Sequence, residues 1–232
     1  AEADKMATNL SGGQQQRASL ARAIVSKPRL LLFDEPLSNL DLKLREQMRV
    51  ELKRIQNEVG ITSIYVTHDQ SEALVMSDEI IVMSKGKIEQ RGGPLEIYSR
   101  PVNEYVSNFI GVANLLKGKV IEVNEPGQGV FELAQGGKKV KMPCLLSPGI
   151  SAGEDAVLSV RPENVHAVRE KDDSTSLEGE VTFAIFLGSH VDCRVQWGDF
   201  EWKVIAHPRT KLKAGEKVYL SFDPEHTLAV QP

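Results

Sequence analysis

The stretch Leu30-Leu31-Leu32-Phe33-Asp34-Glu35 decides the fold, because an unbroken apolar run leads directly into two carboxylates. A short, continuously apolar segment is typical of a strand in a parallel sheet that is covered on both faces. Sheets of this kind bind ligands at the carboxyl ends of their strands. We therefore predict a buried strand over residues 30–33 that delivers Asp34 and Glu35 to a ligand site.

The segments on either side of this strand have the pattern of helices. Residues 11–26 are predicted to form a helix that Lys27-Pro28 ends. Its inward stripe would consist of Ala18, Ala21, Ile24 and Val25. Residues 41–60 repeat apolar side chains at three- and four-residue steps and end at Gly60, so they predict an amphipathic second helix.

A second buried strand is predicted over residues 61–67, which are β-branched and aromatic, and it would deliver His68 to the same edge of the sheet. This alternation of helix and strand indicates part of a parallel α/β domain. After His68 we predict a short helix, a strand pair around Lys85-Gly86 and two more short helices. We place the boundary at Gly111, so that this domain comprises residues 1–111.

Residues 112–232 differ in character, with short strands, turn signals and an internal repeat. Residues 158–163 (Leu-Ser-Val-Arg-Pro-Glu) recur as residues 220–225 (Leu-Ser-Phe-Asp-Pro-Glu). A Gly-x-Val core is shared by residues 117–120 and 178–181. Two tandem copies of one small, OB-like β-barrel unit are therefore predicted.

The composition indicates an ordinary soluble globular protein. The formal net charge is −4 and no long Lys/Arg block occurs, which argues against a nucleic-acid partner. Cys144 and Cys193 lie far apart in strand-like stretches, so buried reduced thiols in a cytosolic protein are favoured over a disulfide. We find no signal segment and no apolar run near the ~20 residues of a membrane span, so work at a membrane would require docking on chains that span it.

The turn Leu10-Ser11-Gly12-Gly13-Gln14 supports two interpretations. Ser11 and Gln14 have the spacing of a capping box, in which their side chains satisfy free backbone groups at a helix start. Gly12 and Gly13 lack Cβ atoms, so backbone N–H groups could also approach an anion at the positive end of this helix. A γ-phosphate would fit there.

Asp34, Glu35, Asp41 and His68 are the further candidate residues. The two acids could be a polar strand exit, but they also match phosphate chemistry, in which one carboxylate holds Mg²⁺ and the other deprotonates an attacking water. Asp41 could simply cap the following helix. His68 could be structural or could contact a γ-phosphate, whereas a metal-ligand role is disfavoured because no second His or Cys stands at ligand spacing.

The sequence lacks a P-loop, the glycine-rich loop with a lysine that binds the phosphates of ATP. No Gly-x-x-x-x-Gly-Lys-Ser/Thr motif occurs in the 232 residues. The nearest candidate, between Gly111 and Lys119, has the wrong spacing and ends in Val120. We therefore expect a chain that has lost, or been separated from, its own phosphate cradle.

Four motifs together resemble the ATP-binding-cassette (ABC) ATPases in order and spacing: residues 10–17, Asp34-Glu35-Pro36, residues 38–41 and Thr67-His68-Asp69. The resemblance covers the C-terminal half of the nucleotide-binding domain, which has an α/β P-loop NTPase fold. Residues 112–232 are similar to the TOBE domain of the importer subfamily for maltose, polyamines, sulfate or ferric iron. The implied protein is a bacterial or archaeal importer ATPase at the cytoplasmic face of the inner membrane, which couples ATP hydrolysis to solute uptake.

The resemblance also implies a role for each candidate at the ATP of the same chain. Asp34 would assist Mg²⁺, Glu35 would be the general base, and His68 would sense the γ-phosphate. The lysine loop, an adenine-stacking aromatic residue and a glutamine loop that senses the permease would all lie upstream.

A second set of residues would serve a partner, because these ATPases sandwich two ATP molecules in a head-to-tail homodimer. Ser11, Gly12, Gly13 and Gln14 would contact the nucleotide of the partner, and Asp41 would link the two sites. Two transmembrane permease subunits and, indirectly, an extracytoplasmic solute-binding protein are the other implied partners. The transported solute cannot be derived from this sequence.

Two alternatives stay open. Residues 112–232 could act alone as a regulatory, dimerisation or small-oxyanion-binding module. A cassette ATPase of DNA repair shares the signature turn, but the acidic balance and the lack of coiled-coil heptads argue against it.

For the chain by itself we expect no ATP hydrolysis. The resemblance implies that one strand is missing between the strand before His68 and the strand that contains Ile80. A vacant strand position would leave unpaired edges and uncovered apolar faces, which favour aggregation.

Overall fold

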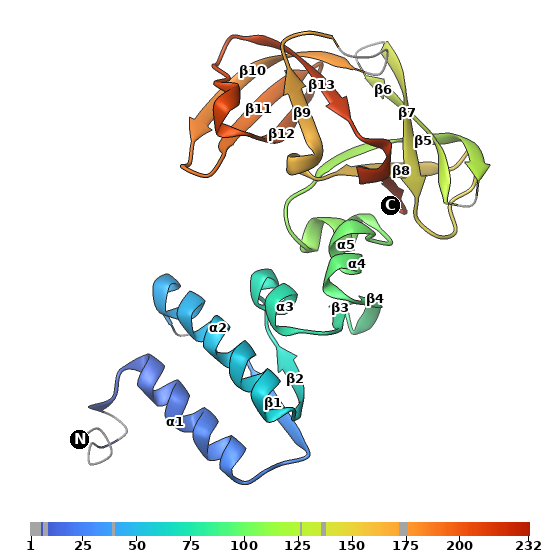
Figure 1. The fold of residues 1–232 in the computed structure, drawn as a ribbon. Coiled ribbons are helices and arrows are strands. Elements are labelled where there is room, and N and C mark those ends of the chain that lie inside the picture. Colours follow the sequence, from blue (N-terminus) through green and yellow to red (C-terminus); the bar gives the residue numbers. More distant parts are fainter. Residues whose placement is uncertain (1–5, 7–8, 39, 126, 136–137, 172–175) are drawn as a thin grey trace. The chain divides into compact units, whose positions relative to one another are not determined.

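The computed structural model describes residues 6, 9–38, 40–125, 127–135, 138–171 and 176–232 (Figure 1). The chain divides into two compact units, which we describe separately. The α/β unit comprises Ala1–Ile80 with Gly92–Pro94, and the β unit comprises Ile81–Arg91 with Leu95–Pro232. The units thus divide earlier than the expected boundary at Gly111, because the hairpin and two short helices before Gly111 group with the β unit.

The α/β unit alternates helices and strands as predicted. Its elements are α1 (Gly12–Val25), β1 (Leu30–Asp34), α2 (Leu42–Val59), β2 (Thr62–Val66) and α3 (Gln70–Met76). β1 and β2 pair in parallel, from Leu30 opposite Thr62 to Asp34 opposite Val66. The Gly60 C-cap ends α2 in the left-handed conformation, with φ of 65°, as the sequence indicates.

The predicted burial of both strands on both faces is wrong. Buried residues of the helices and of the loop after β1 form a core with Phe33 and Tyr65 on one face of the pair. On the other face, Leu32, Ile64 and Val66 are 71%, 52% and 53% exposed. The described helices therefore cover one face, which matches the expectation of uncovered apolar surface around a vacant strand position.

The predicted inward stripe of α1 is also wrong. Ala18, Ala21 and Val25 are exposed, whereas Gly13 and Leu20 are buried and Ile24 packs partly against the core. The helix is rotated relative to the prediction because a glycine permits the closest approach to α2. An added Cβ on Gly13 would lie 3.1 Å from Cδ1 of Leu44.

A hairpin and two short helices follow in the chain. They are β3 (Ile80–Ser84), β4 (Lys87–Gly92), α4 (Pro94–Ser99) and α5 (Glu104–Phe109). β3 pairs with β4 in a sheet separate from β1 and β2, and the turn uses positive φ at Lys85 and Gly86. Asn103 caps α5 by accepting a hydrogen bond from the N–H of Val106. The helix therefore starts directly after Asn103.

The β unit contains a closed barrel and a five-stranded sheet. The barrel order is β14 (Thr227–Val230), β7 (Lys138–Leu146), β6 (Gln128–Gln135), β5 (Asn114–Glu125) and β8 (Asp155–Val160). The sheet order is β12 (Phe200–Ala206), β11 (Val191–Trp197), β10 (Leu177–Phe186), β13 (Lys217–Phe222) and β9 (Val165–Val168). The first predicted copy forms a barrel, whereas the second is an open sheet rather than the predicted barrel.

The two repeats exchange their last strands. After the 3₁₀ turn Pro162–Asn164, the first repeat sends β9 to pair with β13 of the second. After the equivalent turn Pro224–His226, the second repeat sends β14 to pair with β8 of the first. Buried side chains of both repeats accordingly form one hydrophobic cluster, so neither repeat completes its core alone.

The repeated glycines mark sites of close backbone approach. A Cβ on Gly118 of β5 would lie 2.5 Å from the carbonyl oxygen of Glu132, and a Cβ on Gly179 of β10 would lie 2.7 Å from that of Gln196. The valine that follows each glycine by two residues, Val120 or Val181, is fully buried. The Gly-x-Val core therefore combines contact between neighbouring strands with a side chain in the interior.

One buried amide satisfies the edge strand of the open sheet. The side chain of Asn114 donates to the carbonyl oxygens of Val160 (3.2 Å) and Lys203 (2.9 Å) and accepts from the N–H of Lys203 (2.7 Å). Lys203 lies on β12, an edge strand of this sheet. A side chain of the first repeat thus takes the place of a backbone ladder at the edge of the second.

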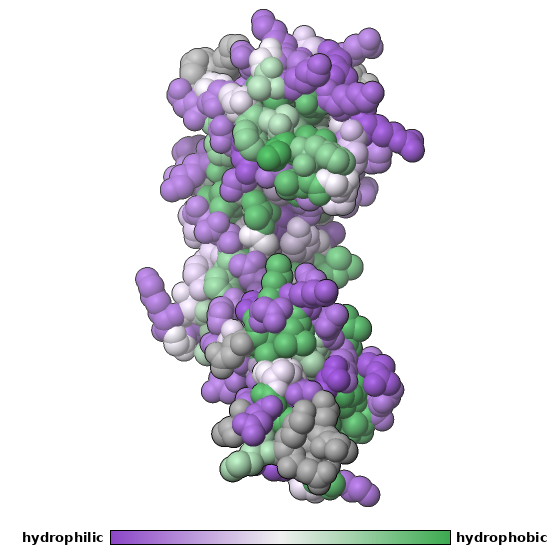
Figure 2. Space-filling view, turned by 90° about the vertical axis from the view of Figure 1, so that its left-hand side faces the viewer, coloured by the Kyte–Doolittle hydropathy of each residue, from purple (hydrophilic) through white to green (hydrophobic). Residues whose placement is uncertain are grey.

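The end of β10 departs from simple alternation. A register shift between Val181 and Phe183 reverses which residues face inward, as β-bulges do. Hydrophobic side chains reach the molecular surface among hydrophilic ones (Figure 2). In this strand Phe183, Ile185 and Phe186 are 46%, 45% and 64% exposed.

The two cysteines are buried and free, as predicted. Burial raises the pKa of Cys144 to about 12 and also raises the pKa of Cys193. Among the described residues, no helix combines the length and the apolar character needed to cross a bilayer.

Candidate functional site

The parallel register brings the two predicted strand ends together. Asp34 is the last residue of β1, and the N–H of Glu35 donates to the carbonyl of Val66 at 2.9 Å. Glu35 adopts a left-handed backbone with φ of 44°. Its carbonyl accepts from both the N–H (3.2 Å) and the hydroxyl (3.0 Å) of Ser38. A non-glycine residue in this region costs about 1–3 kcal/mol, so the turn holds Glu35 in a strained but defined position.

Glu35 and His68 form a direct side-chain contact. The Nδ1 atom of His68 lies 3.0 Å from Oε1 of Glu35. The His68 side chain is 74% exposed and the Glu35 side chain 46% exposed. The pair is therefore open to a ligand from solution, with the Nε2 atom of His68 left for a second partner.

A hydrogen-bond network holds the segment that carries His68. The buried carboxylate of Glu72 accepts from the hydroxyls of Tyr65 (3.0 Å) and Thr67 (2.9 Å). The Thr67 hydroxyl in turn accepts from the N–H of Asp69 at 2.9 Å. Burial and the neighbouring Glu72 carboxylate raise the pKa of the Tyr65 phenol. Both residues that flank His68 are thus fixed to the start of α3.

Asp69 ties this segment to α2. It caps α3 by accepting from the N–H groups of Ser71 (2.9 Å) and Glu72 (3.3 Å). Its other oxygen lies 3.6 Å from Arg45 and 3.7 Å from Arg49. Burial alone would raise the pKa of this carboxyl, but the hydrogen bonds from Ser71 and Glu72 and the charge of Arg49 outweigh it and lower the pKa.

The sequence did not predict the hydrogen bonds and ion pairs of Asp69 and Glu72 that hold the segment around His68. A local signal exists, because Asp69 precedes a predicted helix and has the character of an N-cap. The ion pairs to α2 have no such signal, since they join residues distant in sequence.

The turn at residues 10–14 forms the predicted capping box. The N–H of Ser11 donates to Oε1 of Gln14 at 2.9 Å, and the N–H of Gln14 donates to the Ser11 hydroxyl at 3.4 Å. Gly12 has a packing role as well, because its Cβ would lie 3.2 Å from Cδ2 of Leu40. The interpretation as a helix cap is confirmed, and the exposed Ser11 stays accessible to an anion.

Asp41 caps the next helix, as its simpler interpretation predicts. Its carboxylate accepts from the N–H of Leu44 at 3.0 Å. Leu44 also touches the position of the Gly13 Cβ. The starts of α1 and α2 therefore lie together, and the predicted residues fall into two groups: two helix starts and two strand ends.

Asp34 suits a magnesium ion in chemistry and exposure. Its carboxylate is exposed, and among the described residues it makes no hydrogen bond or ion pair. Mg²⁺ is usually held by one or two protein carboxylates together with water and substrate phosphates. The described part of the chain contains no cluster of three or more His, Cys, Asp and Glu residues that could hold a metal ion. Asp34 would therefore need water and substrate phosphates as the other ligands of the ion.

Comparisons with known proteins match both units. Residues 1–38 match the ABC transporter family model, and residues 158–230 match the TOBE domain model. A spermidine/putrescine import ATP-binding protein PotA from Clostridium novyi is 45% identical over 94% of this chain and 58% of its own length. The corresponding protein of Acetivibrio thermocellus is 42% identical over 93% of this chain and 57% of its own length. The chain thus spans somewhat more than half of these relatives.

The chain was also compared with solved structures. The cytoplasmic molybdate-binding protein ModG is 17% identical, with a TM-score of 0.44, over 51% of this chain and 96% of its own length.

Proposed function

Because the chain joins part of an ABC transporter ATP-binding domain to a TOBE domain, we propose that it belongs to the ATP-hydrolysing subunit of a binding-protein-dependent importer. The ATPase part would extend to Gly111 and the TOBE part would comprise residues 112–232. The 3.0 Å contact between Glu35 and His68 at the ends of paired parallel strands carries the proposal. Fold alone would not, because function depends on the site.

The chain's own residues have defined tasks at the ATP of the same subunit. Glu35 accepts the proton of the water that attacks the γ-phosphorus, and the left-handed turn aims its carboxylate. His68 contacts Glu35 through Nδ1, so its Nε2 atom is left to contact a γ-phosphate oxygen. The Glu72 and Asp69 network keeps the imidazole at the strand end.

Asp34 would hold Mg²⁺, directly or through water. When bound, the ion would neutralise phosphate charge that develops during the transfer. Its exposed carboxylate beside Glu35 separates the two tasks, since one acid binds the ion while the other takes the proton.

The two helix starts would serve a partner subunit. Ser11, Gly12, Gly13 and Gln14 form the positive end of α1, where backbone N–H groups attract anions. They would contact the ATP of the second subunit in a head-to-tail homodimer. Asp41, which caps the adjacent start of α2, would link the two sites.

Two permease subunits in the membrane would receive the conformational change, so the protein would act at the cytoplasmic face without entering the bilayer. We propose a polyamine as the imported solute, because relatives named for spermidine and putrescine import are 42–45% identical. An extracytoplasmic binding protein would deliver the solute. Nucleic acid is not an expected partner, given the net charge of −4.

Hydrolysis would need a lysine phosphate loop that these 232 residues do not contain. The chain alone is therefore expected to show no ATP turnover. A measurable turnover number for the purified 232-residue chain would contradict this.

Transport tests the proposed function. The full-length protein would be reconstituted in vesicles with its permease and binding protein, and uptake of labelled spermidine would be followed. ATP-dependent uptake that is lost in Glu35→Gln and kept in Glu58→Gln is the expected result, because Glu58 lies on α2 and pairs with Arg54. Uptake of spermidine without ATP would contradict the assignment as an ATPase. ATP-driven uptake of another solute, with no uptake of spermidine, would contradict the polyamine assignment.

A further inference from the structure

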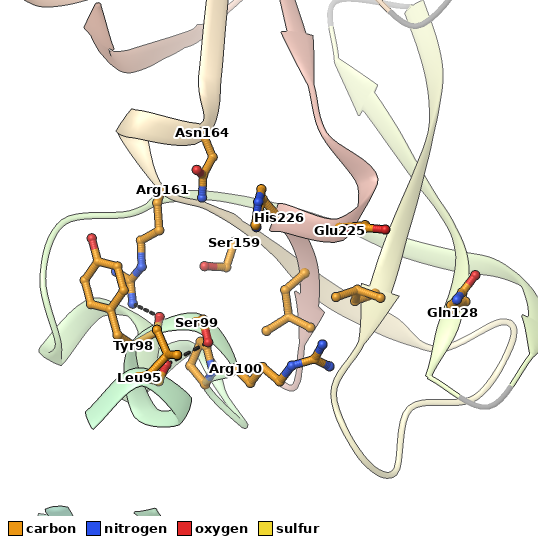
Figure 3. A pocket seen from close by; sticks show the side chains of 13 residues that line it. Leu95, Tyr98, Ser99, Arg100, Gln128, Ser159, Arg161, Asn164, Glu225 and His226 are labelled. Carbon is orange, nitrogen blue, oxygen red and sulfur yellow. Dashed lines mark hydrogen bonds between the residues drawn. The ribbon is translucent and has the colours of Figure 1, made fainter. Parts of the chain in front are cut away.

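The β unit contains a pocket of about 540 Å³ between α4 and the closed barrel (Figure 3). This volume lies within the range of about 300–1,000 Å³ that small-molecule sites occupy. Its walls come from α4 and the loop after it, from β6, β7, β8 and β14, and from both 3₁₀ turns. None of these elements belongs to the proposed ATP site.

Part of the wall is apolar. Leu95, Pro101, Leu145 and Leu228 line the pocket. Leu95 is 78% exposed. A ligand with an apolar body would remove this surface from water, at about 25 cal/mol per Å².

Three polar side chains of the wall have no partner within the described part of the chain. They are the guanidinium of Arg100, the amide of Asn164 and the imidazole of His226. Figure 3 shows Arg100 and Asn164 at opposite edges of the hollow, with Ser159 between them. These groups offer hydrogen-bond donors to a ligand without breaking an existing bond.

Arg161 adds a second, fixed positive charge to the wall. Its guanidinium donates to the carbonyls of Ser107 (3.1 Å), Val112 (3.2 Å) and Tyr98 (2.9 Å) and lies over the Tyr98 ring at 4.3 Å. All these acceptors are neutral, so the charge is bonded but not cancelled by them. Burial lowers the pKa of Arg161 despite the nearby charges of Tyr98 and Glu163.

Two acids lie near the pocket, and one of them lines it. Glu225 is the lining carboxylate, and in Figure 3 its side chain points away from Ser159 and Arg161. Glu163 accepts from the Tyr98 hydroxyl and does not line the hollow. The lining thus holds Arg100 and Arg161 with one acid, and Glu163 acts on the charge of Arg161 from outside the lining.

The geometry points to a binding site for a small organic anion, in which an apolar body packs on Leu95 and Leu145 and an anionic head meets Arg100. An inorganic oxyanion would leave Leu95 exposed to water, and a cation would meet the charge of Arg100 and Arg161.

Titration of the 232-residue chain with hexanoate, followed by two-dimensional NMR, tests the site. Saturable binding near about 1 mM is expected for a ligand of this size. Acetate, which lacks the apolar body, hexanamide, which lacks the charge, and hexylamine, which reverses it, should all bind more weakly.

Two pairs of variants separate the site from general charge effects. Arg100→Gln should weaken hexanoate binding about tenfold, since it removes a charged hydrogen bond, whereas Lys117→Gln on the exposed face of β5 should leave it unchanged. Asn164→Asp should weaken binding by adding a negative charge to the wall, whereas Asn124→Asp, on β5, should leave it unchanged. No saturable hexanoate binding, equal binding of hexylamine, or equal losses in both members of a pair would overturn the proposal.

Discussion

The Nδ1 atom of His68 lies 3.0 Å from Oε1 of Glu35, so the ends of two neighbouring strands present one acid–imidazole pair. This contact follows from the parallel pairing of β1 with β2, which places Asp34 opposite Val66. The side chains are exposed, but the backbone on both sides is fixed by the Ser38 turn and by the Thr67 hydroxyl. The structure thus presents the pair on rigid supports.

Replacing His68 tests its role at the phosphate. In the full-length protein, His68→Ala should lower the turnover number for ATP about a hundredfold or more, because it removes a donor aimed at developing charge. Binding of a fluorescent ATP analogue should persist. His166→Ala, at an exposed position of β9, should leave turnover unchanged, and equal losses in the two variants would argue against a specific role.

Asn114 should stabilise the β unit. Asn114→Ala leaves the N–H and the carbonyl of Lys203 without their partner, so the free energy of unfolding should fall by about 1–3 kcal/mol. Urea denaturation followed by the fluorescence of the buried Trp202 measures this. The exposed Asn124 provides the control, since Asn124→Ala should leave the urea midpoint unchanged.

The repeated glycines should not accept a methyl group. Gly118→Ala and Gly179→Ala would place Cβ atoms 2.5 and 2.7 Å from carbonyl oxygens of neighbouring strands. Each should lower the free energy of unfolding by about 1–3 kcal/mol through overpacking. Gly93→Ala, with nothing within 4 Å of its Cβ, should not. A neutral effect at Gly118 would contradict the described strand contact.

Stability should fall in alkali because of Cys144. Burial raises the pKa of this thiol to about 12, whereas an unfolded cysteine titrates near about 8.5. The folded state therefore holds the proton more tightly. Its stabilising contribution is complete below about pH 8.5 and is lost as the pH rises toward 12.

Removal of the thiol should flatten this pH dependence. Between pH 9 and 11, the free energy of unfolding of Cys144→Ala should fall less steeply than that of the original chain, by up to about 1.4 kcal/mol per pH unit. Met142→Ala, at another buried position of β7, should be less stable but keep the original slope. An unchanged slope in Cys144→Ala would contradict the assignment.

Local patterns predicted much of the fold. The limits of α2, its Asp41 and Gly60 caps and the Lys85-Gly86 hairpin follow from residues next to one another in the chain. The tandem repeat was predicted because residues 158–163 recur as residues 220–225. The contact between Glu35 and His68 was foreseeable as well, because parallel strands bring their carboxyl ends to one edge.

Other features depend on partners that a local pattern does not name. The apolar run of β1 predicts cover on both faces, but Leu32 is exposed because the described helices pack on one face. The rotation of α1 depends on the approach of Gly13 to Leu44. The edge contact of Asn114 with Lys203 joins residues 89 positions apart. The exchange of β9 and β14 likewise depends on pairing with strands that are distant in the sequence.

The turnover number of Glu35→Gln in the full-length protein decides whether Glu35 is the general base. ATP should still bind while the turnover number falls about 10²–10⁴-fold, because the general base is lost. Glu58→Gln on α2 should retain the original rate. Undiminished ATP hydrolysis by Glu35→Gln would contradict the assignment of Glu35, and with it the function proposed for the pair with His68.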